Sequence, residues 1–149
     1  MSPVRSAAAA LGGSPDDTES AFYDALQRGD IELLMQCWAD DDDILCVHPG
    51  GPRMLGARAI RAAFEAMFAH GAVHARPLQV LRVSSVSSAV HSVIEQVEMV
   101  LPDGVHRAMV LATNVYHRTP EGWRMVAHHA SPGSSPEADM LQAQKPRLH

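Results

Sequence analysis

The spacing of hydrophobic residues changes near His70, and this change limits the possible folds more than any other feature of the sequence. Before it, apolar residues recur every three or four positions, as in Ile60, Phe64 and Met67, which is the period of an amphipathic helix. After it, apolar and polar residues alternate, which is the period of a β-strand. The sequence therefore predicts an α+β fold, with helices on one face of a curved antiparallel sheet.

Three helices are expected in the N-terminal half. The first starts at Ser14, because a serine can cap a helix and the acidic residues that follow meet the positive end of its dipole. Gly29 ends it, and a short second helix follows from Asp30. A buried strand over 44–48 then precedes the third helix, which runs from Gly56 to Gly71.

Turn signals divide the rest of the chain into four expected strands: 78–83, 89–101, 106–118 and 123–130. Asp103-Gly104 is a strong hairpin signal. If these two residues form the centre of the turn, Glu95 lies opposite Ala112. A second turn that pairs Arg118 with Trp123 completes a meander.

This register gives the sheet two different faces. One face gathers polar groups among small and apolar side chains: His91, Glu95, Asn114, Tyr116 and His129. Because a carboxylate, an amide, a phenol and an imidazole converge there, this face suits a ligand pocket. The other face is more apolar and suits contact with a second subunit. A register error of one residue would exchange the two faces.

The closing segment 122–132 carries two adjacent histidines, which point to opposite faces if side chains alternate regularly. We expect His129 to enter the pocket and His128 to face away. A Glu95–His129 pair would be sufficient for general acid–base catalysis, because each partner shifts the pKa of the other toward neutral pH. Glu95 and His129 are therefore the candidate catalytic residues. The alternatives are a structural pairing of the buried carboxylate and a satisfied core histidine.

Five further residues are candidates for ligand binding: His48, His91, Asn114, Tyr116 and Trp38. His48 follows a strand and precedes a proline, so it can reach the mouth of a pocket. Plain sheet packing is the alternative for the three residues on the polar face. For Trp38, a core position is the commoner role of such a tryptophan.

Composition argues against several classes of function. The net charge is −5, and the basic residues are dispersed and do not form the positive patch that binds nucleic acid. No apolar run is long enough for a membrane span. Nine histidines raise the question of a metal, but no predicted element carries an HxH, HxxxH or HExxH motif. The acidic run 40–43 lacks the glycine and distal glutamate of a calcium loop, which favours a solvated turn. We expect neither a metal nor a cofactor.

The expected organisation is a flexible leader over 1–13, a single domain over 14–132 and a flexible tail over 133–149. The apolar run near the N-terminus is too short for a typical secretory signal. Two cysteines without CxxC spacing favour reduced, packed thiols, which is typical of a cytoplasmic protein.

The stretch from Asp16 to Pro132 resembles the SnoaL-like branch of the nuclear transport factor 2-like superfamily. The likeness rests on the order of elements and on three segments: 44–52, 112–116 and 122–132. The last segment also resembles the association domain of calcium/calmodulin-dependent protein kinase II, whose motif residues match Trp123, Val126, His129 and Ser131. In that domain arginines line the pocket at positions that look like Glu95 and Asn114, so its ligand preference is not expected here.

The resemblance implies a conical barrel with a pocket between helices and sheet, usually as a dimer. It implies little about chemistry, because this fold hosts isomerases, dehydratases, cyclases and hydrolases. The expected function is that of a small-molecule pocket protein, and its catalytic form would be an acid–base enzyme of isomerase, dehydratase or hydrolase type acting on a small hydrophobic or polyketide-like substrate. A non-catalytic binding module and an oligomerisation module are the alternatives. The expected partners are an unknown small molecule and a second copy of the chain, which packs against the outer sheet face.

Overall fold

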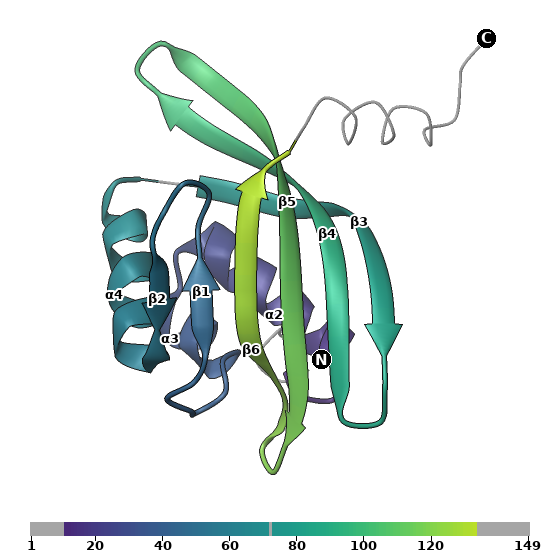
Figure 1. The fold of residues 1–149 in the computed structure, drawn as a ribbon. Coiled ribbons are helices and arrows are strands. Elements are labelled where there is room, and N and C mark those ends of the chain that lie inside the picture. The colour runs from purple at the N-terminus through teal and green to yellow at the C-terminus, as the bar shows by residue number, and fades with distance from the viewer. Residues whose placement is uncertain (1–10, 72, 134–149) are drawn as a thin grey trace, which may run out of the picture.

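A computed structural model describes residues 11–71 and 73–133 (Figure 1). The helices are α2 (Pro15–Arg28), α3 (Ile31–Gln36) and α4 (Gly56–Ala69). The strands are β1 (Leu45–Val47), β2 (Arg53–Leu55), β3 (Val73–Ser84), β4 (Ser88–Leu101), β5 (Gly104–Thr119) and β6 (Gly122–Pro132). The α+β class is confirmed, and β2 is a strand that was not predicted from the sequence.

The six strands form one curved, open sheet in the order β2-β1-β6-β5-β4-β3. Neighbouring strands are antiparallel except β1 and β6, which run parallel. The helices lie behind the sheet in the view of Figure 1, with α2 crossing behind the central strands and α4 beside β2. The core lies between these two layers and includes the fully buried Phe22, Leu34, Ile60 and Phe64. The curvature of the sheet leaves its concave face available for a site.

The first helix begins and ends as the sequence predicts. The hydroxyl oxygen of Ser14 accepts a hydrogen bond from the amide of Asp17 at 3.0 Å, and Pro15 occupies the first turn. Gly29 ends the helix with φ of 67°, a conformation that L residues with side chains rarely adopt. The buried stripe of this helix includes Phe22, Ala25 and Leu26.

The β4–β5 hairpin turns one residue earlier than expected. Leu101 pairs with Gly104, so Pro102 and Asp103 are the central residues of the turn and Glu95 lies opposite Val110. Proline has the φ that the first central position of a common turn requires, and this preference outweighs the Asp-Gly signal. The expected pairing of Glu95 with Ala112 is therefore wrong by two residues. A shift of two residues preserves the faces, because side chains alternate with period two.

A β-bulge in β6 reverses the expected positions of the two histidines. Arg118 pairs with Trp123 as expected, but the register then slips, and Val126 is the extra residue in β6. The strand alternation restarts after this residue, so His128 points to the concave face. His129 is exposed on the opposite face, and the expectation that it enters the pocket is wrong.

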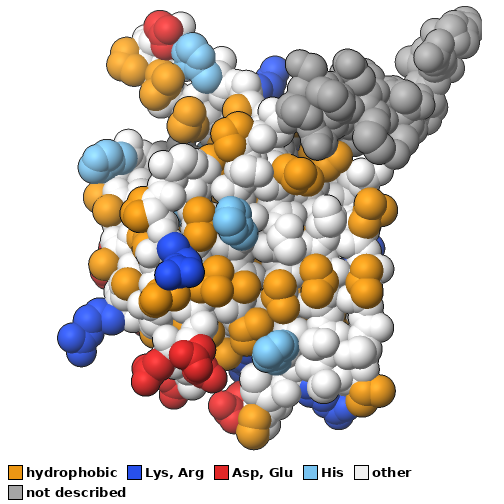
Figure 2. Space-filling model, in the orientation of Figure 1, with side chains coloured by type: hydrophobic (Ala, Val, Ile, Leu, Met, Phe, Trp, Pro, Cys, Tyr) orange, Lys and Arg blue, Asp and Glu red, His pale blue; other side chains and the backbone are white. Residues whose placement is uncertain are grey.

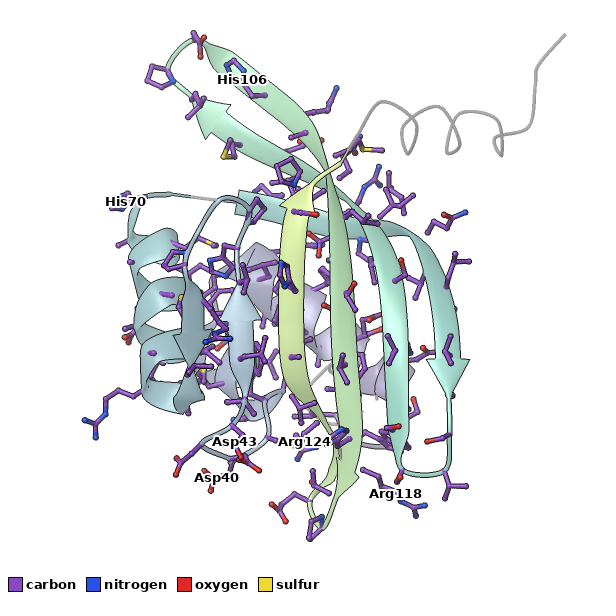
Figure 3. The ribbon with its side chains drawn as sticks, viewed as in Figure 1. Asp40, Asp43, His70, His106, Arg118 and Arg124 are labelled. Atoms are coloured by element: carbon purple, nitrogen blue, oxygen red, sulfur yellow. The ribbon has the colours of Figure 1, made fainter. Side chains whose placement is uncertain are left out.

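The loop after α3 is tied to the start of β6. The amide of Ala39 donates to the carbonyl of Met125 at 2.9 Å, and the amide of Met125 donates to the carbonyl of Cys37 at 2.8 Å. The acidic residues 40–43 that follow form an exposed turn, with Asp40 and Asp43 close to the end of the molecule where Arg124 lies (Figure 3). Cys37 and Cys46 are buried free thiols, and burial raises the pKa of each to about 12.

The ends of the described chain are anchored to the sheet. The carbonyl of Gly12 accepts a hydrogen bond from the amide of Trp123 at 3.0 Å, and the amide of Gly133 donates to Met109 at 2.8 Å. Most of the expected leader and tail, residues 1–10 and 134–149, lies outside the described residues. None of the described helices has the length and apolarity that a membrane crossing requires.

Candidate functional site

A cavity of about 430 Å³ opens between the concave face of the sheet and the helices. Its walls are mainly apolar and include Leu26, Phe64, Met67, Val97, Val110 and Ala130. Three titratable side chains also line it: His48, Glu95 and His128. An apolar cavity with a few converging polar groups is the usual form of a small-molecule site.

Glu95 projects from β4 into this cavity and is only 4% exposed. The pKa of its carboxyl group is raised to about 7, mainly by burial and in smaller part by the nearby charge of Glu19. A hydrogen bond from the hydroxyl group of Tyr23 opposes this shift, because it stabilises the ionised form. A carboxyl group that titrates near neutral pH can accept and return a proton during catalysis.

Tyr23 links Glu95 to the polar residues behind the cavity wall. Its hydroxyl group donates to Glu95 and accepts a hydrogen bond from Nδ2 of Asn114 at 3.1 Å. Burial, with the charge of Glu95 as a second cause, raises the pKa of Tyr23 well above its ordinary value. Tyr23 therefore remains a neutral phenol that donates its proton in a hydrogen bond.

A second buried carboxylate, Glu19 on α2, lies next to this pair. Its Oε2 accepts hydrogen bonds from the hydroxyl group of Tyr116 at 2.6 Å, from Nδ2 of Asn114 at 3.2 Å and from Nδ1 of His91 at 2.8 Å. Three donors on one oxygen compensate for the loss of water around the charge. This carboxylate organises the polar side chains of the sheet.

The polar face of the sheet thus contains the expected residues in a different arrangement. His91, Asn114 and Tyr116 share a face with Glu95, but Glu19 binds all three behind the cavity wall. None of the three is among the residues that line the cavity. Their direct binding of a ligand stays a prediction, and the structure gives them a clear role in positioning.

Sequence reasoning missed Glu19 and Tyr23. Both lie on the buried stripe of α2 with Phe22 and Leu26, at spacings of three and four residues. A glutamate on such an apolar stripe would have been the signal, because a buried carboxylate requires donors from the opposite layer.

His128 takes the place in the cavity that was expected for His129. The amide nitrogen Nδ2 of Asn114 donates to Glu19 and Tyr23, which leaves the amide oxygen Oδ1 as an acceptor. This oxygen accepts a hydrogen bond from Nδ1 of His128 at 2.6 Å. Burial lowers the pKa of His128 to about 3, with repulsion from His48 as a further cause. The ring is therefore neutral, and its Nε2 is a hydrogen-bond acceptor.

His48 lies directly after β1 and lines the cavity near His128. Its ring centroid is 4.9 Å from that of Phe64 and 6.4 Å from that of His128. Burial lowers the pKa of its imidazole group, and its Nε2 is buried with no hydrogen-bond partner among the described residues. An unpaired buried nitrogen costs about 1–3 kcal/mol, so a bound ligand is a natural partner for it.

The two remaining candidates lie away from the cavity. His129 is exposed on the outer face, where it pairs with Thr113, so no Glu95–His129 pair forms. Trp38 is 4% exposed and lines a separate groove between α3 and α4. The polar atoms of the cavity come instead from β4, β6 and the end of β1.

One group of residues has the composition of a metal site. Ligand atoms of Asp16, Glu19 and His91 lie within 4.8 Å of one another. However, Glu19 already accepts three hydrogen bonds, and the carboxylate of Asp16 is paired with Arg82 at 2.8 Å. Protons and a guanidinium group therefore occupy the positions that a cation would need, and we propose no metal here.

A curved sheet over helices, with a carboxyl group and two imidazoles on an apolar cavity, defines a class of α+β pocket proteins. The chain belongs to the SnoaL-like domain family, whose model matches residues 17–135. No curated protein matches the sequence.

Two solved structures of bacterial proteins are similar at the level of sequence as well as fold. A protein from Thiobacillus denitrificans, provisionally named a calcium/calmodulin-dependent protein kinase type II association domain, is 34% identical with a TM-score of 0.75. The match covers 83% of this chain and 98% of that one. A protein from Streptomyces avermitilis, provisionally named a dehydratase of the NTF2-like family, is 28% identical with a TM-score of 0.72, over 79% of this chain and 93% of that one.

A nuclear transport factor 2-like protein from Salmonella enterica shares the fold alone. It is 16% identical with a TM-score of 0.72, and the match covers 80% of this chain and 88% of that one. These similarities confirm the fold class and the family that the sequence predicts.

Proposed function

We propose that this protein is an enzyme that transfers protons to and from a small uncharged molecule bound in the cavity. Glu95 is the proton-transferring group in this proposal. The observation that carries it is the position of this carboxyl group in an apolar cavity wall with a pKa of about 7. At neutral pH both protonation states of Glu95 are then populated, which is what a general base and a general acid require.

The chemistry of the wall supports a substrate that is mostly apolar and carries a hydrogen-bond donor. The neutral His128 offers an acceptor nitrogen, and His48 offers a nitrogen that has no partner among the described residues. The carboxyl groups of Glu95 and the neighbouring Glu19 disfavour a negatively charged substrate in this part of the cavity. A hydroxylated or enolisable ketone of polyketide type fits these conditions better than an organic acid.

Two reactions fit a single carboxyl group of this kind. In an isomerisation, ionised Glu95 accepts a proton from a carbon next to a carbonyl group and returns it to another carbon of the same molecule. In a dehydration, ionised Glu95 accepts that proton and then returns it to the hydroxyl oxygen on the neighbouring carbon, so that the hydroxyl group leaves as water and Glu95 is ionised again. The provisional dehydratase name of the Streptomyces avermitilis protein supports including the second reaction.

The test uses deuterium exchange, because it detects proton abstraction before the natural substrate is known. The protein is incubated in heavy water with a panel of cyclic ketones and β-hydroxy ketones. Mass spectrometry records gain of deuterium or loss of water. We expect the wild-type protein to accelerate one of these changes for part of the panel.

The matched variants are Glu95→Gln and Glu98→Gln. Glu95→Gln should slow the reaction about 10²- to 10⁴-fold, because the amide cannot accept the proton. Glu98, on the same strand, pairs with Arg107 at 3.0 Å outside the cavity, so its variant should retain full activity. Equal activity in Glu95→Gln would remove Glu95 from the mechanism. A ligand that binds tightly and is never changed would favour a non-catalytic binding module.

We also propose a homodimer formed through the outer face of the sheet. Leu81, Val83 and Val90 lie on this face, and they are 61%, 74% and 38% exposed. Figure 2 shows hydrophobic side chains in a row across this face of the sheet. Contiguous apolar surface of this kind typically marks a protein interface. Native mass spectrometry distinguishes the dimer from a monomer and also detects a retained ligand.

A further inference from the structure

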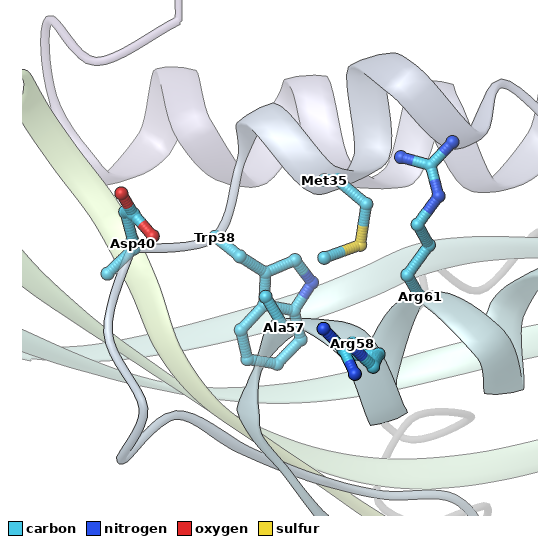
Figure 4. A pocket seen from close by; sticks show the side chains of 7 residues that line it. Met35, Trp38, Asp40, Ala57, Arg58 and Arg61 are labelled. Carbon is cyan, nitrogen blue, oxygen red and sulfur yellow. The ribbon is translucent and has the colours of Figure 1, made fainter.

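A second hollow lies between the end of α3 and the start of α4, apart from the cavity described above. It measures about 450 Å³ and is lined by Met35, Trp38, Ala39, Asp40, Ala57 and Arg58, with Arg61 at its edge (Figure 4). We call it the α3–α4 groove. It shares no lining residue with the cavity of Glu95. Whatever it binds therefore need not take part in the proton transfer proposed above.

The start of α4 offers to this groove amide groups that have no acceptor among residues 11–71 and 73–133. The N-cap residue is Leu55, which provides no side-chain cap, and the first turn contains no acidic residue. The amide of Gly56 donates to the carbonyl of Ile44 at 2.9 Å. The next two amides, of Ala57 and Arg58, have no acceptor within the helix. The positive end of the helix dipole thus lies open at the groove.

An independent observation comes from the indole group of Trp38. This side chain is 4% exposed, and its Nε1 is buried without a hydrogen-bond partner in the described part of the chain. Figure 4 shows the ring beside the start of α4, with Nε1 directed to the side where Met35 and Arg58 lie. Both are long, flexible side chains that can move to admit an acceptor. The buried N–H group is a donor that lacks an acceptor.

Arg58 supplies a positive charge at the same place. Among the described residues, no carboxylate forms an ion pair with Arg58, whose side chain is exposed. Its neighbour Arg61, in contrast, is held by Glu32 and by Glu65, the latter at 3.4 Å. Arg58 is therefore the cation that remains available to a ligand in the groove.

We propose that the α3–α4 groove binds the carboxylate of a small amphipathic molecule. The carboxylate accepts hydrogen bonds from the guanidinium group of Arg58, the indole N–H of Trp38 and the free amides of the first turn of α4. The apolar part of the molecule lies along Met35, Ala39 and Ala57. Asp40 lies at the other end of the groove and disfavours a second negative charge there, so the ligand is a monoanion (Figure 4).

The test follows the indole N–H resonances of the ¹⁵N-labelled full-length protein by NMR. The chain has two tryptophans, and a Trp123→Phe variant assigns the two signals. The probes are 4-phenylbutyrate, the uncharged 4-phenyl-1-butanol and inorganic phosphate. We expect 4-phenylbutyrate to shift the Trp38 signal saturably, and the alcohol and phosphate to leave it unchanged at the same concentrations.

Two arginine variants separate the site from general charge effects. Arg58→Gln should weaken the binding of 4-phenylbutyrate at least about tenfold, because it removes the positive charge of the site. Arg53→Gln changes an exposed arginine of β2 that does not line the groove and should leave the affinity unchanged.

Five results would overturn the proposal. An unmoved Trp38 signal, or equal shifts by acid and alcohol, would show that no carboxylate is recognised. A saturable shift by phosphate alone would show an anion site in which the apolar wall has no role. Unchanged affinity in Arg58→Gln would exclude the proposed contact. Shifts confined to the imidazole signals of His48 and His128 would place the probe in the Glu95 cavity.

Discussion

Glu19 and Glu95 are buried to nearly the same extent, at 5% and 4% exposure, yet their surroundings differ. Glu19 accepts three hydrogen bonds on one oxygen, whereas the structure gives Glu95 one, from Tyr23, and places it on a cavity wall. Burial alone therefore does not distinguish a structural carboxylate from the one that we propose to be reactive. The number of donors and the access to a ligand make the distinction.

The largest expected effect is on stability. Glu19→Ala leaves the hydroxyl group of Tyr116, the amide of Asn114 and His91 without their acceptor. Because each unsatisfied buried donor costs about 1–3 kcal/mol, the free energy of unfolding should fall by about 3 kcal/mol or more. Glu95→Ala should cost about 1 kcal/mol or less at pH 8, since it also removes an unfavourable buried charge. Urea unfolding measures both, and equal losses would contradict the proposed division of roles.

A smaller effect is expected in the pH dependence of stability. The folded pKa of Glu95, about 7, lies above its ordinary value of 4.5, so the folded state binds this proton more tightly than the unfolded state. The stabilisation is fully present below pH 4.5 and is lost as the pH rises through about 7. Between pH 5 and 8 the wild-type protein should lose about 2–3 kcal/mol relative to Glu95→Gln.

The comparison with Glu95→Gln removes the opposing contribution of His128. The pKa of His128 is lowered to about 3. The contribution of His128 to the free energy of unfolding is therefore present above pH 6.5 and is lost as the pH falls through about 3. Both proteins carry His128, and its effect cancels in the difference. Parallel stability curves over pH 5–8 would show that Glu95 titrates normally.

The smallest effect concerns the two buried tyrosines. Tyr23 donates to Glu95 and Tyr116 donates to Glu19. Tyr23→Phe removes the hydrogen bond that lowers the pKa of Glu95, so this pKa should rise. Tyr116→Phe should leave the pKa of Glu95 unchanged. ¹³C NMR of the Glu95 carboxyl group over a pH titration measures this pKa in each variant. Equal titration midpoints in the two variants would contradict a specific effect of Tyr23 on Glu95.

Much of the fold could be predicted from the sequence because its signals are local. The helix start at Ser14 and its end at Gly29 depend on neighbouring residues. The residues of β4 and β5 were assigned to the correct faces although the hairpin turn was misplaced. Side chains alternate with period two, so the two-residue error in pairing Glu95 left its face unchanged.

The candidate site was less predictable because it depends on contacts between distant elements. Glu95 was identified from its place in an apolar strand, but its partner Tyr23 comes from α2, 72 residues away. The prediction that His129 enters the pocket was wrong because the local sequence pattern does not indicate the bulge at Val126. Trp38 was a candidate for ligand binding, whereas it lines a separate groove between α3 and α4.

The bulge at Val126, and not only the residue types of β6, decides which imidazole reaches the interior. The same residues in a regular strand without the bulge would exchange the two histidines between the buried and the solvent side. Two relatives could then share an identical His-His pair and still present opposite members of it to their ligands. An alignment by residue identity would match them perfectly and assign the inner position to the wrong side chain. The presence or absence of a bulge in this strand is therefore as informative about the interior as a substitution.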